Sequence, residues 1–392
     1  MKIGLWIKDN YNPNRGGGFS YADRLIKAMD SYAFTGDFEI CFISLAEEKP
    51  ANLQHKYHYV GLIPRILKKT PFVGRWLQEL DKRVLFRYWG YTRLNKNSIA
   101  FVYYLTPGSI PSLKSSFVTC HWDIGHCSTY PFPEIESGFN GRYQYYNIRI
   151  LQSMLVFVES EAGKQELLKY TPLGEHKIRV VPIFGGGLVD LTIDEGSSKC
   201  ILNKWNLEVN GYFLYPAQYW AHKNHIGLLN GFSRYMEKYS NFKLVLCGSD
   251  KGNKKYVCET IHRLGLDNNV VVCGFVSDEE LAVLYRNAFA LVMASYFGPT
   301  NMPPIEAMDF GIPVVCSDVE GHREILGDAG VFFDPKDYDS ISEGLIEITE
   351  KREKYAQLIR ERKTISKFNI KQALKCIDEY LKEACVIRST WK

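Results

Sequence analysis

The sequence predicts an α/β protein built from two doubly wound domains that face a central cleft. Its 392 residues exceed the usual size of one hydrophobic core, which favours two domains. Short apolar runs alternate with segments of helical periodicity in both halves of the chain, a pattern typical of mostly parallel sheets covered by helices. Between the two series, residues 184–199 are rich in Gly, Ser and Asp, so a connection between domains is expected there.

Each strand is predicted from a short run of apolar and β-branched residues. In the first half these runs are 2–7, 39–44, 99–104, 117–120, 155–158 and 178–181, and in the second half 212–215, 243–247, 270–272, 290–293 and 314–316. We place an N-terminal domain at 1–190, a linker at 191–205 and a C-terminal domain at 206–371. A last helix, 372–392, is expected to pack back on the N-terminal domain.

Composition and charge exclude several classes of protein. The formal net charge is only +4, which does not indicate nucleic acid as a partner. Asp9 and Asn10 interrupt the N-terminus before the apolar core of a signal peptide could form, and no apolar run approaches the roughly 20 residues of a membrane-spanning helix. The ten cysteines show no C-x-x-C spacing. We therefore expect a cytoplasmic protein, with the inner face of the cell membrane as an alternative location.

Two loops that follow strands are candidates for phosphate binding, because ligands of open α/β sheets bind beyond the carboxyl ends of the strands. Gly16, Gly17 and Gly18 follow the first strand and precede a helix, so their backbone amides can approach an oxyanion, although an ordinary flexible turn has the same composition. Lys223 lies between a strand and a helix, where its charge can meet a diphosphate.

The segment 296–316 carries the most specific signal. Pro303 and Pro304 suit the start of a helix, and Gly311 suits its end, so a short helix is predicted between two strands. Glu306 then lies in the first turn, where its carboxylate can accept two hydrogen bonds from a vicinal diol such as a ribose. The alternative is a simple acidic residue at a helix N-terminus.

From Phe297 to Asp318 the chain resembles glycosyltransferase family 4 (glycosyl transferases group 1), whose donor loop reads E-x-F-G-x-P-x-x-E-A-M-x-x-G-x-P-V-V. Residues 271–281 and 321–330 extend the resemblance. It implies the GT-B fold, in which two Rossmann-like domains face a central cleft. The variant forms of residues 298–301 and 216–225 are similar to a branch that makes bacterial surface polysaccharide.

The resemblance assigns most of the donor site. It implies that Glu306 holds the ribose, that Asn301 and Met302 hold the sugar through backbone amides, and that Lys223 neutralises the diphosphate. Further donor contacts are expected at Gly248 and Phe275. Two family residues are replaced: the first Glu of the donor loop is Gly298, and an Arg five residues before Lys223 is Gln218. We expect Gln218, Thr300 and Asn301 to supply neutral hydrogen bonds there.

In the first half, residues 119–126 resemble the family loop that faces the sugar. Asp123 and His126 are the expected catalytic contacts besides Lys223. His121 is the second candidate for the contact assigned to His126. A structural role is an open alternative for either histidine. Ser160 and Glu161 are similar to a family pair at the end of a strand beside the cleft.

The implied activity is a retaining transfer of a hexose from a nucleotide-sugar to a glycan or polyprenyl-linked oligosaccharide, in O-antigen, capsule or exopolysaccharide synthesis. The family's mechanism lets the leaving diphosphate deprotonate the acceptor, so neither a metal nor another cofactor is expected. Two alternatives stay open: a GT-B sugar-nucleotide epimerase, which releases a free rearranged sugar, and a catalytically silent subunit that binds a sugar nucleotide.

Residues 64–96 form a basic segment with interleaved apolar residues. Nine Lys or Arg stand against Glu79 and Asp81, with Phe72, Trp76 and Trp89 among the apolar residues. This pattern suits peripheral contact with an anionic membrane, and a solvated basic face over an ordinary helix is the alternative.

Overall fold

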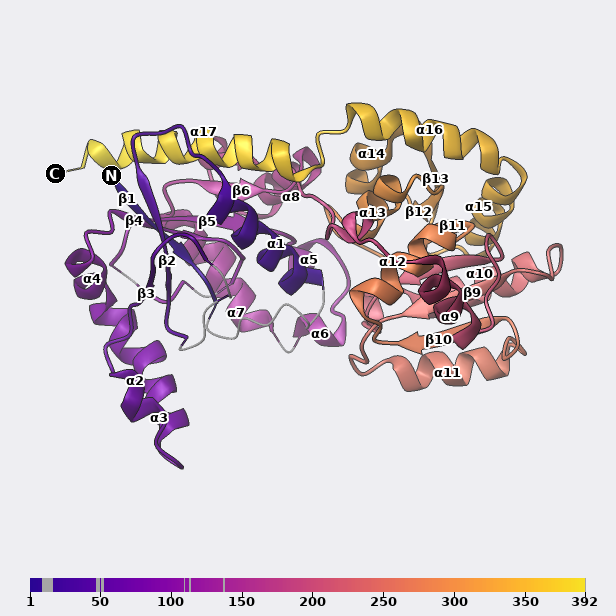
Figure 1. Cartoon of the computed structure of the whole chain (residues 1–392), viewed down its shortest axis with the longest axis horizontal. Coiled ribbons are helices and arrows are strands. Elements are labelled where there is room, and N and C mark those ends of the chain that lie inside the picture. Colours follow the sequence, from indigo (N-terminus) through magenta and orange to yellow (C-terminus); the bar gives the residue numbers. More distant parts are fainter. Residues whose placement is uncertain are drawn as a thin grey trace.

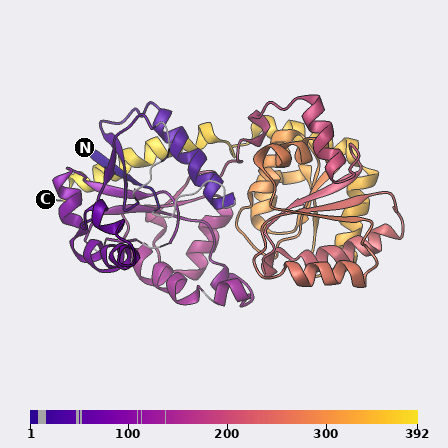
Figure 2. The same ribbon diagram turned by 60° about the horizontal axis from the view of Figure 1, so that its bottom comes forward.

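The computed structural model describes residues 1–8, 17–46, 50, 53–108, 110–112, 114–136 and 138–391. They form two lobes that stand side by side, each built on one parallel sheet (Figures 1 and 2). The strands predicted from the sequence all form, with ends within two residues of the expected positions. The predicted α/β architecture of two doubly wound sheets is confirmed.

The N-terminal sheet has seven strands in the described residues, in the order β3-β2-β1-β4-β5-β6-β7. The strands are β1 (Lys2–Trp6), β2 (Glu39–Ser44), β3 (Tyr57–Tyr59), β4 (Phe101–Tyr104), β5 (Phe117–His121), β6 (Val156–Val158) and β7 (Ile178–Val180). The helices are α1 (Gly17–Ser31), α2 (Arg65–Lys68), α3 (Gly74–Leu80), α4 (Phe86–Lys96), α5 (Gly125–Ser128), α6 (Pro133–Glu136), α7 (Phe139–Gln144) and α8 (Glu161–Tyr170). Strand β3 was not predicted, because three half-buried residues carry too short a pattern.

The C-terminal sheet has six strands in the described part of the chain, in the order β10-β9-β8-β11-β12-β13. The strands are β8 (Tyr212–Pro216), β9 (Lys243–Cys247), β10 (Val270–Gly274), β11 (Ala290–Met293), β12 (Val314–Ser317) and β13 (Gly330–Phe333). The helices are α9 (Glu195–Lys204), α10 (His225–Met236), α11 (Lys254–Arg263), α12 (Asp278–Asn287), α13 (Met302–Phe310), α14 (Glu320–Leu326), α15 (Tyr338–Glu350) and α16 (Arg352–Ile365). The short strand β13 was also missed.

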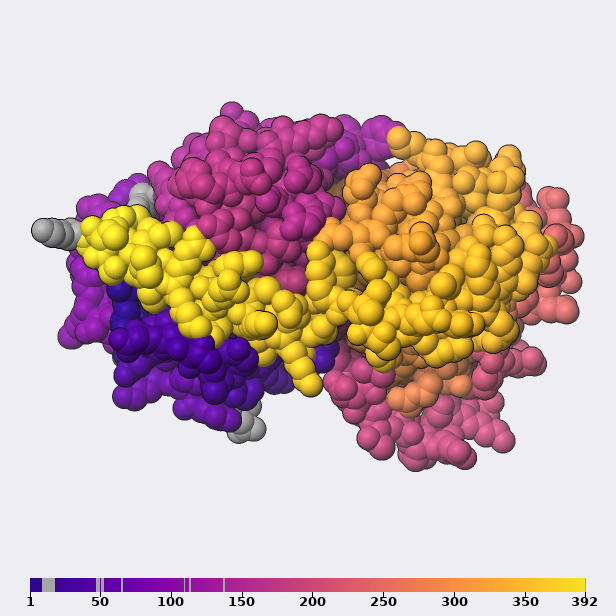
Figure 3. Space-filling model, turned by 90° about the horizontal axis from the view of Figure 1, so that it is seen from above, coloured from indigo at the N-terminus to yellow at the C-terminus, as the bar shows by residue number. Residues whose placement is uncertain are grey.

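The predicted linker 191–205 is not a simple connection, because most of it forms α9. Asp194 caps this helix by accepting a hydrogen bond from the Ser197 amide, and α9 packs against α12 of the C-terminal lobe. The Gly and Ser content that suggested a linker therefore belongs to a capped helix. At the chain's end, α17 (Ile370–Ser389) returns to the N-terminal lobe and packs against α1, and α16 and α17 together run across both lobes (Figure 3).

In both sheets, the order in which successive strands are added reverses at a central strand. This reversal positions the site. In the N-terminal sheet, β1 lies between β2 and β4, and in the C-terminal sheet β8 lies between β9 and β11. Chains that leave neighbouring strands at such a point diverge and open a crevice beyond the carboxyl ends. The loops that follow β8 and β11 therefore face the other lobe.

Helix α13 forms as its sequence predicts. Pro303 and Pro304 lie in its first turn, where a missing amide hydrogen costs nothing, and Gly311 ends the helix at φ 72°, a conformation that glycine adopts without strain. The helix follows directly on the loop after β11. Its N-terminus consequently faces the cleft, which Asn301 and Met302 line.

Candidate active site

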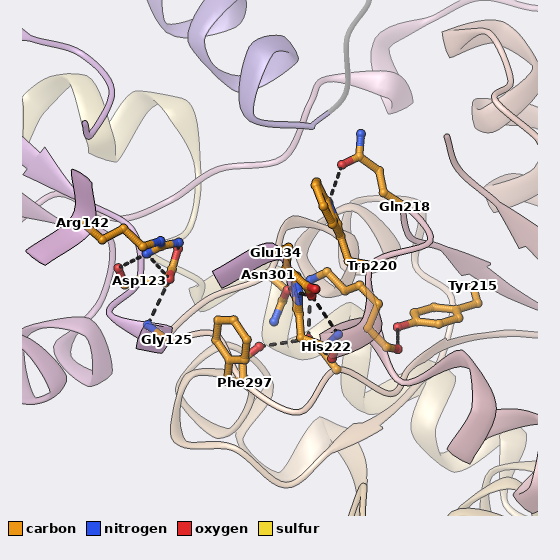
Figure 4. Close-up of polar contacts among 12 residues, drawn as sticks. Asp123, Gly125, Glu134, Arg142, Tyr215, Gln218, Trp220, His222, Phe297 and Asn301 are labelled. Atoms are coloured by element: carbon orange, nitrogen blue, oxygen red, sulfur yellow. Dashed lines mark hydrogen bonds and ion pairs between the residues drawn. The ribbon is translucent and has the colours of Figure 1, made fainter. Parts of the chain in front are cut away.

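A cleft of about 870 Å³ lies between the two lobes. The N-terminal lobe contributes one wall, with Gly18, Tyr21, Trp122, Asp123 and Glu159. The C-terminal lobe contributes the other, with Gln218, Trp220, His222, Lys223, Phe275, Phe297, Gly298, Thr300, Asn301, Met302 and Glu306. Most of the residues predicted to bind the donor therefore line one cavity. Figure 4 shows the polar contacts near its centre.

Lys223 is held in the cleft by a relay of hydrogen bonds. Its Nζ donates to Asn301 Oδ1 at 2.9 Å, and the Asn301 amide nitrogen lies 3.0 Å from His322 Nε2. The Nδ1 of His322 lies 2.8 Å from the Ser317 carbonyl, which accepts only from a protonated nitrogen. Nε2 of the neutral ring is therefore the acceptor, and this turns the Asn301 oxygen toward Lys223.

Lys223 is half-buried in the wall of the cleft. Burial is the main cause that lowers its pKa to about 8, while the charges of Asp123 and Glu134 act in the opposite direction. The positive charge of an ammonium group in such a place is only partly balanced by water and by negative charges. A diphosphate would restore the missing negative charge and raise the pKa again.

Glu306 is a buried carboxylate in the second turn of α13, one turn further from the N-terminus than the sequence predicted, because the helix already begins at Met302. Its Oε2 accepts a hydrogen bond of 2.7 Å from the Tyr285 hydroxyl, and its Oε1 accepts one of 3.1 Å from the Gly186 amide. Burial, the largest cause, raises its pKa, and these two hydrogen bonds lower it. A Cβ on Gly186 would lie 2.9 Å from Oε1, so glycine is required for this approach of the interlobe chain. The carboxylate is thus fixed in orientation.

Three other predicted donor residues lie in different settings. Phe275 lines the cleft with 59% of its surface exposed, as an open aromatic face for a base. Gln218 also lines it, and its Oε1 accepts a hydrogen bond of 3.0 Å from the Trp220 indole. Gly248 is not among the lining residues: a Cβ there would lie 2.2 Å from the Ala217 carbonyl oxygen, so its role is to let two loops pack together.

The predicted glycine loop is only partly described. Gly18 lines the cleft and Gly17 begins α1, whereas Gly16 lies outside the described residues. A Cβ on Gly18 would lie 3.1 Å from the Trp122 ring. The close approach of α1 to Trp122 is therefore a packing reason for this glycine.

The histidines of residues 119–126 do not reach the cleft. His126 stacks on Tyr146 with ring centroids 5.2 Å apart, and His121 is fully buried with Nδ1 3.1 Å from the Tyr146 hydroxyl. Neither is among the lining residues, so the catalytic contact predicted for His126 is not supported by its position. Asp123 does line the cleft, where it forms an ion pair with Arg142 at 2.9 Å (Figure 4).

Two acidic residues of the site were missed from the sequence. Glu134 reaches across from α6, and its Oε1 lies 2.5 Å from His222 Nδ1 and 3.0 Å from the His222 amide (Figure 4). Glu159 follows β6 and accepts a hydrogen bond from the Thr300 hydroxyl. At this strand end the family resemblance points only to Ser160 and Glu161. The available signal was the position of Glu159 directly after a buried apolar strand.

No cluster of three metal-ligating side chains occurs among the described residues. The sequence contains one D-x-D triplet, Asp337-Tyr338-Asp339. Asp337 caps α15 by accepting from the Asp339 amide, and Asp339 pairs with Arg234 at 2.5 Å. None of the three residues is among those that line the cleft.

With this geometry established, comparison with known proteins identifies the C-terminal lobe. Residues 202–364 match the family model described as Glycosyl transferases group 1. The chain resembles that family through this lobe. The chain is 34% identical to O-antigen chain mannosyltransferase B of Escherichia coli over 148 residues. These residues make up 38% of this chain and 39% of that protein. The chain is 30% identical over 133 residues to O-antigen chain mannosyltransferase RfbU of Salmonella typhimurium, covering 34% and 37%.

The family match extends over the lobe that holds the donor loop, and the chain spans less than two fifths of the length of these two curated relatives. The fold similarity extends further. The structure of Anabaena HepE in complex with UDP-glucose superposes over 98% of this chain and 100% of that one, with a TM-score of 0.68 at 16% identity. This confirms the GT-B arrangement of the two lobes.

Proposed function

We propose that the chain is a retaining glycosyltransferase that moves a hexose from a nucleotide-sugar to a glycan or lipid-linked glycan. The observation that carries the proposal is the placement of Lys223 and Glu306 in one cleft, on the wall where β8 and β11 end. A fixed carboxylate that suits a ribose diol and a half-buried ammonium that suits a diphosphate are the two groups that a nucleotide-sugar needs. The names of the relatives make mannose the first donor sugar to test.

The mechanism that fits this site uses the donor's own phosphate. The bond between the anomeric carbon and the diphosphate oxygen breaks, the acceptor oxygen bonds to that carbon on the same face, and the acceptor proton passes to the leaving phosphate. Lys223 and the positive end of the α13 dipole stabilise the charge that develops on the diphosphate. The reaction then needs no protein nucleophile.

A second chamber of about 250 Å³ is proposed to receive the acceptor. It shares Gly18, Trp122, Gln218 and Trp220 with the main cleft and extends toward the carboxyl ends of β1 and β4. Tryptophan rings offer flat apolar faces on which a sugar ring can pack. The acceptor hydroxyl would therefore approach the anomeric carbon from the N-terminal lobe.

Thermal stability in the presence of UDP-, GDP- and dTDP-sugars tests the proposal. A ligand that binds the folded state raises stability by mass action, by about 2.7 kcal/mol at 100 times its dissociation constant. We expect one base to raise the melting temperature, with GDP-mannose as the first candidate. No shift with any nucleotide or nucleotide-sugar would contradict the proposal.

We expect transfer to be independent of divalent metal, because Lys223 supplies the positive charge that a metal supplies elsewhere. The rate measured in excess EDTA should equal the rate in Mg²⁺ or Mn²⁺. Loss of transfer in EDTA, restored by adding one of these ions, would show that this expectation is wrong.

We also propose that helices α2 and α3 contact an anionic membrane surface. They project from the N-terminal lobe (Figure 1), and Ile66, Phe72 and Trp76 are 78%, 103% and 62% exposed. Exposed Arg75 lies beside them. Apolar side chains that lie open beside basic ones suit a lipid surface, to which each basic group adds about 1 kcal/mol. No helix among the described residues is long and apolar enough to cross a bilayer.

One basic residue of this segment, Lys68, does not belong to the exposed surface. Lys68 is 4% exposed, and its Nζ lies 2.5 Å from Asp81 Oδ2. Asp81 also accepts from the Leu62 and Ile63 amides at 3.0 and 3.2 Å. Lys68 therefore holds the base of the projection together, and its neutralisation would leave a buried charge unpaired.

A double variant in which Phe72 and Trp76 are both replaced by Ser should bind phosphatidylglycerol vesicles about tenfold more weakly, or weaker still. Two large apolar side chains then no longer enter the lipid surface. Vesicle flotation of the full chain measures this. The control is Ile365→Ser, which removes a side chain that is 75% exposed on the other lobe. Equal flotation of the double variant and the wild type would contradict membrane contact through α2 and α3.

A further inference from the structure

Glu159 faces the donor loop from the opposite wall of the cleft. It directly follows β6, and its carbonyl oxygen accepts a hydrogen bond of 3.1 Å from the Ile183 amide, which fixes its backbone. Its Oε2 accepts a hydrogen bond from the Thr300 hydroxyl, across 141 positions of sequence. Its Oε1 has no hydrogen-bond partner among the described residues. One oxygen is therefore anchored, and the other is available to a ligand in the cleft.

The donor loop itself carries no charged side chain near this point. Residues 297–301 read Phe-Gly-Pro-Thr-Asn. Gly298 has φ 129°, a region that disfavours residues with a Cβ, and a Cβ there would lie 3.0 Å from Asn301 Nδ2 and 3.2 Å from the Thr300 carbonyl oxygen. This backbone cannot simply present a carboxylate from position 298. The other lobe does bring a carboxyl group to this loop, because Thr300 donates to Glu159.

The other carboxyl groups that line the cleft in the described residues have charged or hydrogen-bonding partners or lie at the start of a helix. Asp123 is paired with Arg142, and Glu306 is held by Tyr285. Asp278 and Glu279 belong to the first turn of α12. Glu159 has no cationic partner among the described residues, and the Thr300 hydroxyl is the one group there that donates a hydrogen bond to its side chain.

Burial favours the protonated form of Glu159 at neutral pH. Burial is the main cause that raises its pKa to about 8; the charge of Asp123 adds to this, and the Thr300 hydrogen bond opposes it. Tyr21 of α1 and Cys120 of β5 also face it, and burial raises the pKa of both well above the ordinary value, so both are neutral. A protonated carboxyl both donates and accepts hydrogen bonds, as a sugar hydroxyl does.

We propose that Glu159 determines sugar specificity by binding a hydroxyl group of the transferred sugar through Oε1, opposite the donor loop. This inference rests on the proposed glycosyltransferase function and extends it with a residue of the N-terminal lobe. Thr300 positions the carboxyl by donating to Oε2. Both lobes thereby contact the sugar of the donor, whereas the nucleotide contacts the C-terminal lobe.

The test compares a nucleotide-sugar with its parent nucleotide by calorimetric titration, using GDP-mannose against GDP and UDP-glucose against UDP. Glu159→Ala should weaken binding of the nucleotide-sugar by about tenfold, the contribution of one buried hydrogen bond, and leave the nucleoside diphosphate within about twofold of wild type. Glu159→Gln keeps one donor and one acceptor and should retain most of the affinity. The control is Glu161→Gln, which makes the same change at an exposed neighbour.

The pH dependence gives a second readout that a structural contact would not move. As the pH rises through about 8, Glu159 loses its proton, so the ratio of nucleotide-sugar to nucleotide affinity should fall in the wild type and stay constant in Glu159→Gln. Titration of Lys223 changes both affinities alike and cancels in the ratio. Equal losses for both ligands in Glu159→Ala, or no loss for either, would overturn the proposal. A wild type that binds no nucleotide would instead overturn the glycosyltransferase function.

Discussion

Replacing Glu306 with Gln is expected to lower the affinity for the nucleotide-sugar by about 100-fold, because two hydrogen bonds from a ribose diol to a carboxylate are worth roughly 3 kcal/mol together. The amide offers only one acceptor, and its NH₂ group opposes the donating groups that now hold the carboxylate, the Tyr285 hydroxyl and the Gly186 amide. Calorimetric titration of the nucleoside diphosphate and of the nucleotide-sugar should show the same loss, because both contain the ribose.

Two variants control this result. Tyr285→Phe keeps the carboxylate but removes its positioning hydroxyl, and a smaller loss of affinity is expected. Glu353→Gln makes the same chemical change at a side chain that is 85% exposed in α16, and it should bind as the wild type does. Wild-type affinity in Glu306→Gln would mean that the ribose does not contact this residue.

Replacing Lys223 with Met is expected to lower the rate of transfer at saturating donor by about 100-fold to 1,000-fold, the usual cost of losing one group that stabilises charge in the transition state. The side chain keeps its length, so the loop after β8 should fold unchanged. Steady-state rates of nucleoside diphosphate release measure the effect. Lys255→Met, at a side chain that is 90% exposed, is the matched control.

The charge of Lys223 also sets a pH dependence. Burial lowers its pKa to about 8, so the ammonium form is present below that pH and is lost above it. Affinity for the nucleoside diphosphate should be constant between pH 6 and about 7.5 and fall at higher pH in the wild type. In Lys223→Met the affinity should be weak and lack this fall. An unchanged rate in Lys223→Met would show that the diphosphate lies elsewhere.

Local patterns explain which parts of this fold were accessible from the sequence. Helix α13 carries its own start and end signals in Pro303, Pro304 and Gly311, so its position followed directly, whereas Glu306 lies one turn further into the helix than predicted. The alternation of apolar runs and helical segments gave the two parallel sheets. Helix α9 was misread because its capping residue Asp194 lies in a stretch rich in Gly and Ser, where periodicity is weak.

The contacts that complete the site join residues far apart in the chain, and local patterns do not reveal them. The Gly186 amide meets Glu306 across 120 positions, and Thr300 meets Glu159 across 141. His126 shows the same limit: its neighbours in sequence suggest a loop facing the cleft, and its ring stacks on Tyr146, 20 positions along the chain. Only the packing of α5 against the rest of the lobe decides where such a ring points.

The most direct test of the account is transfer itself. The purified chain is incubated with the nucleotide-sugar identified by thermal shift and with a membrane lipid fraction, and both the released nucleoside diphosphate and the sugar in the glycolipid are measured. We expect one sugar to appear in the glycolipid, with its anomeric configuration retained, for each nucleoside diphosphate released, and both products to be lost in Glu306→Gln. Release of a free rearranged sugar, or binding without any turnover, would contradict the account.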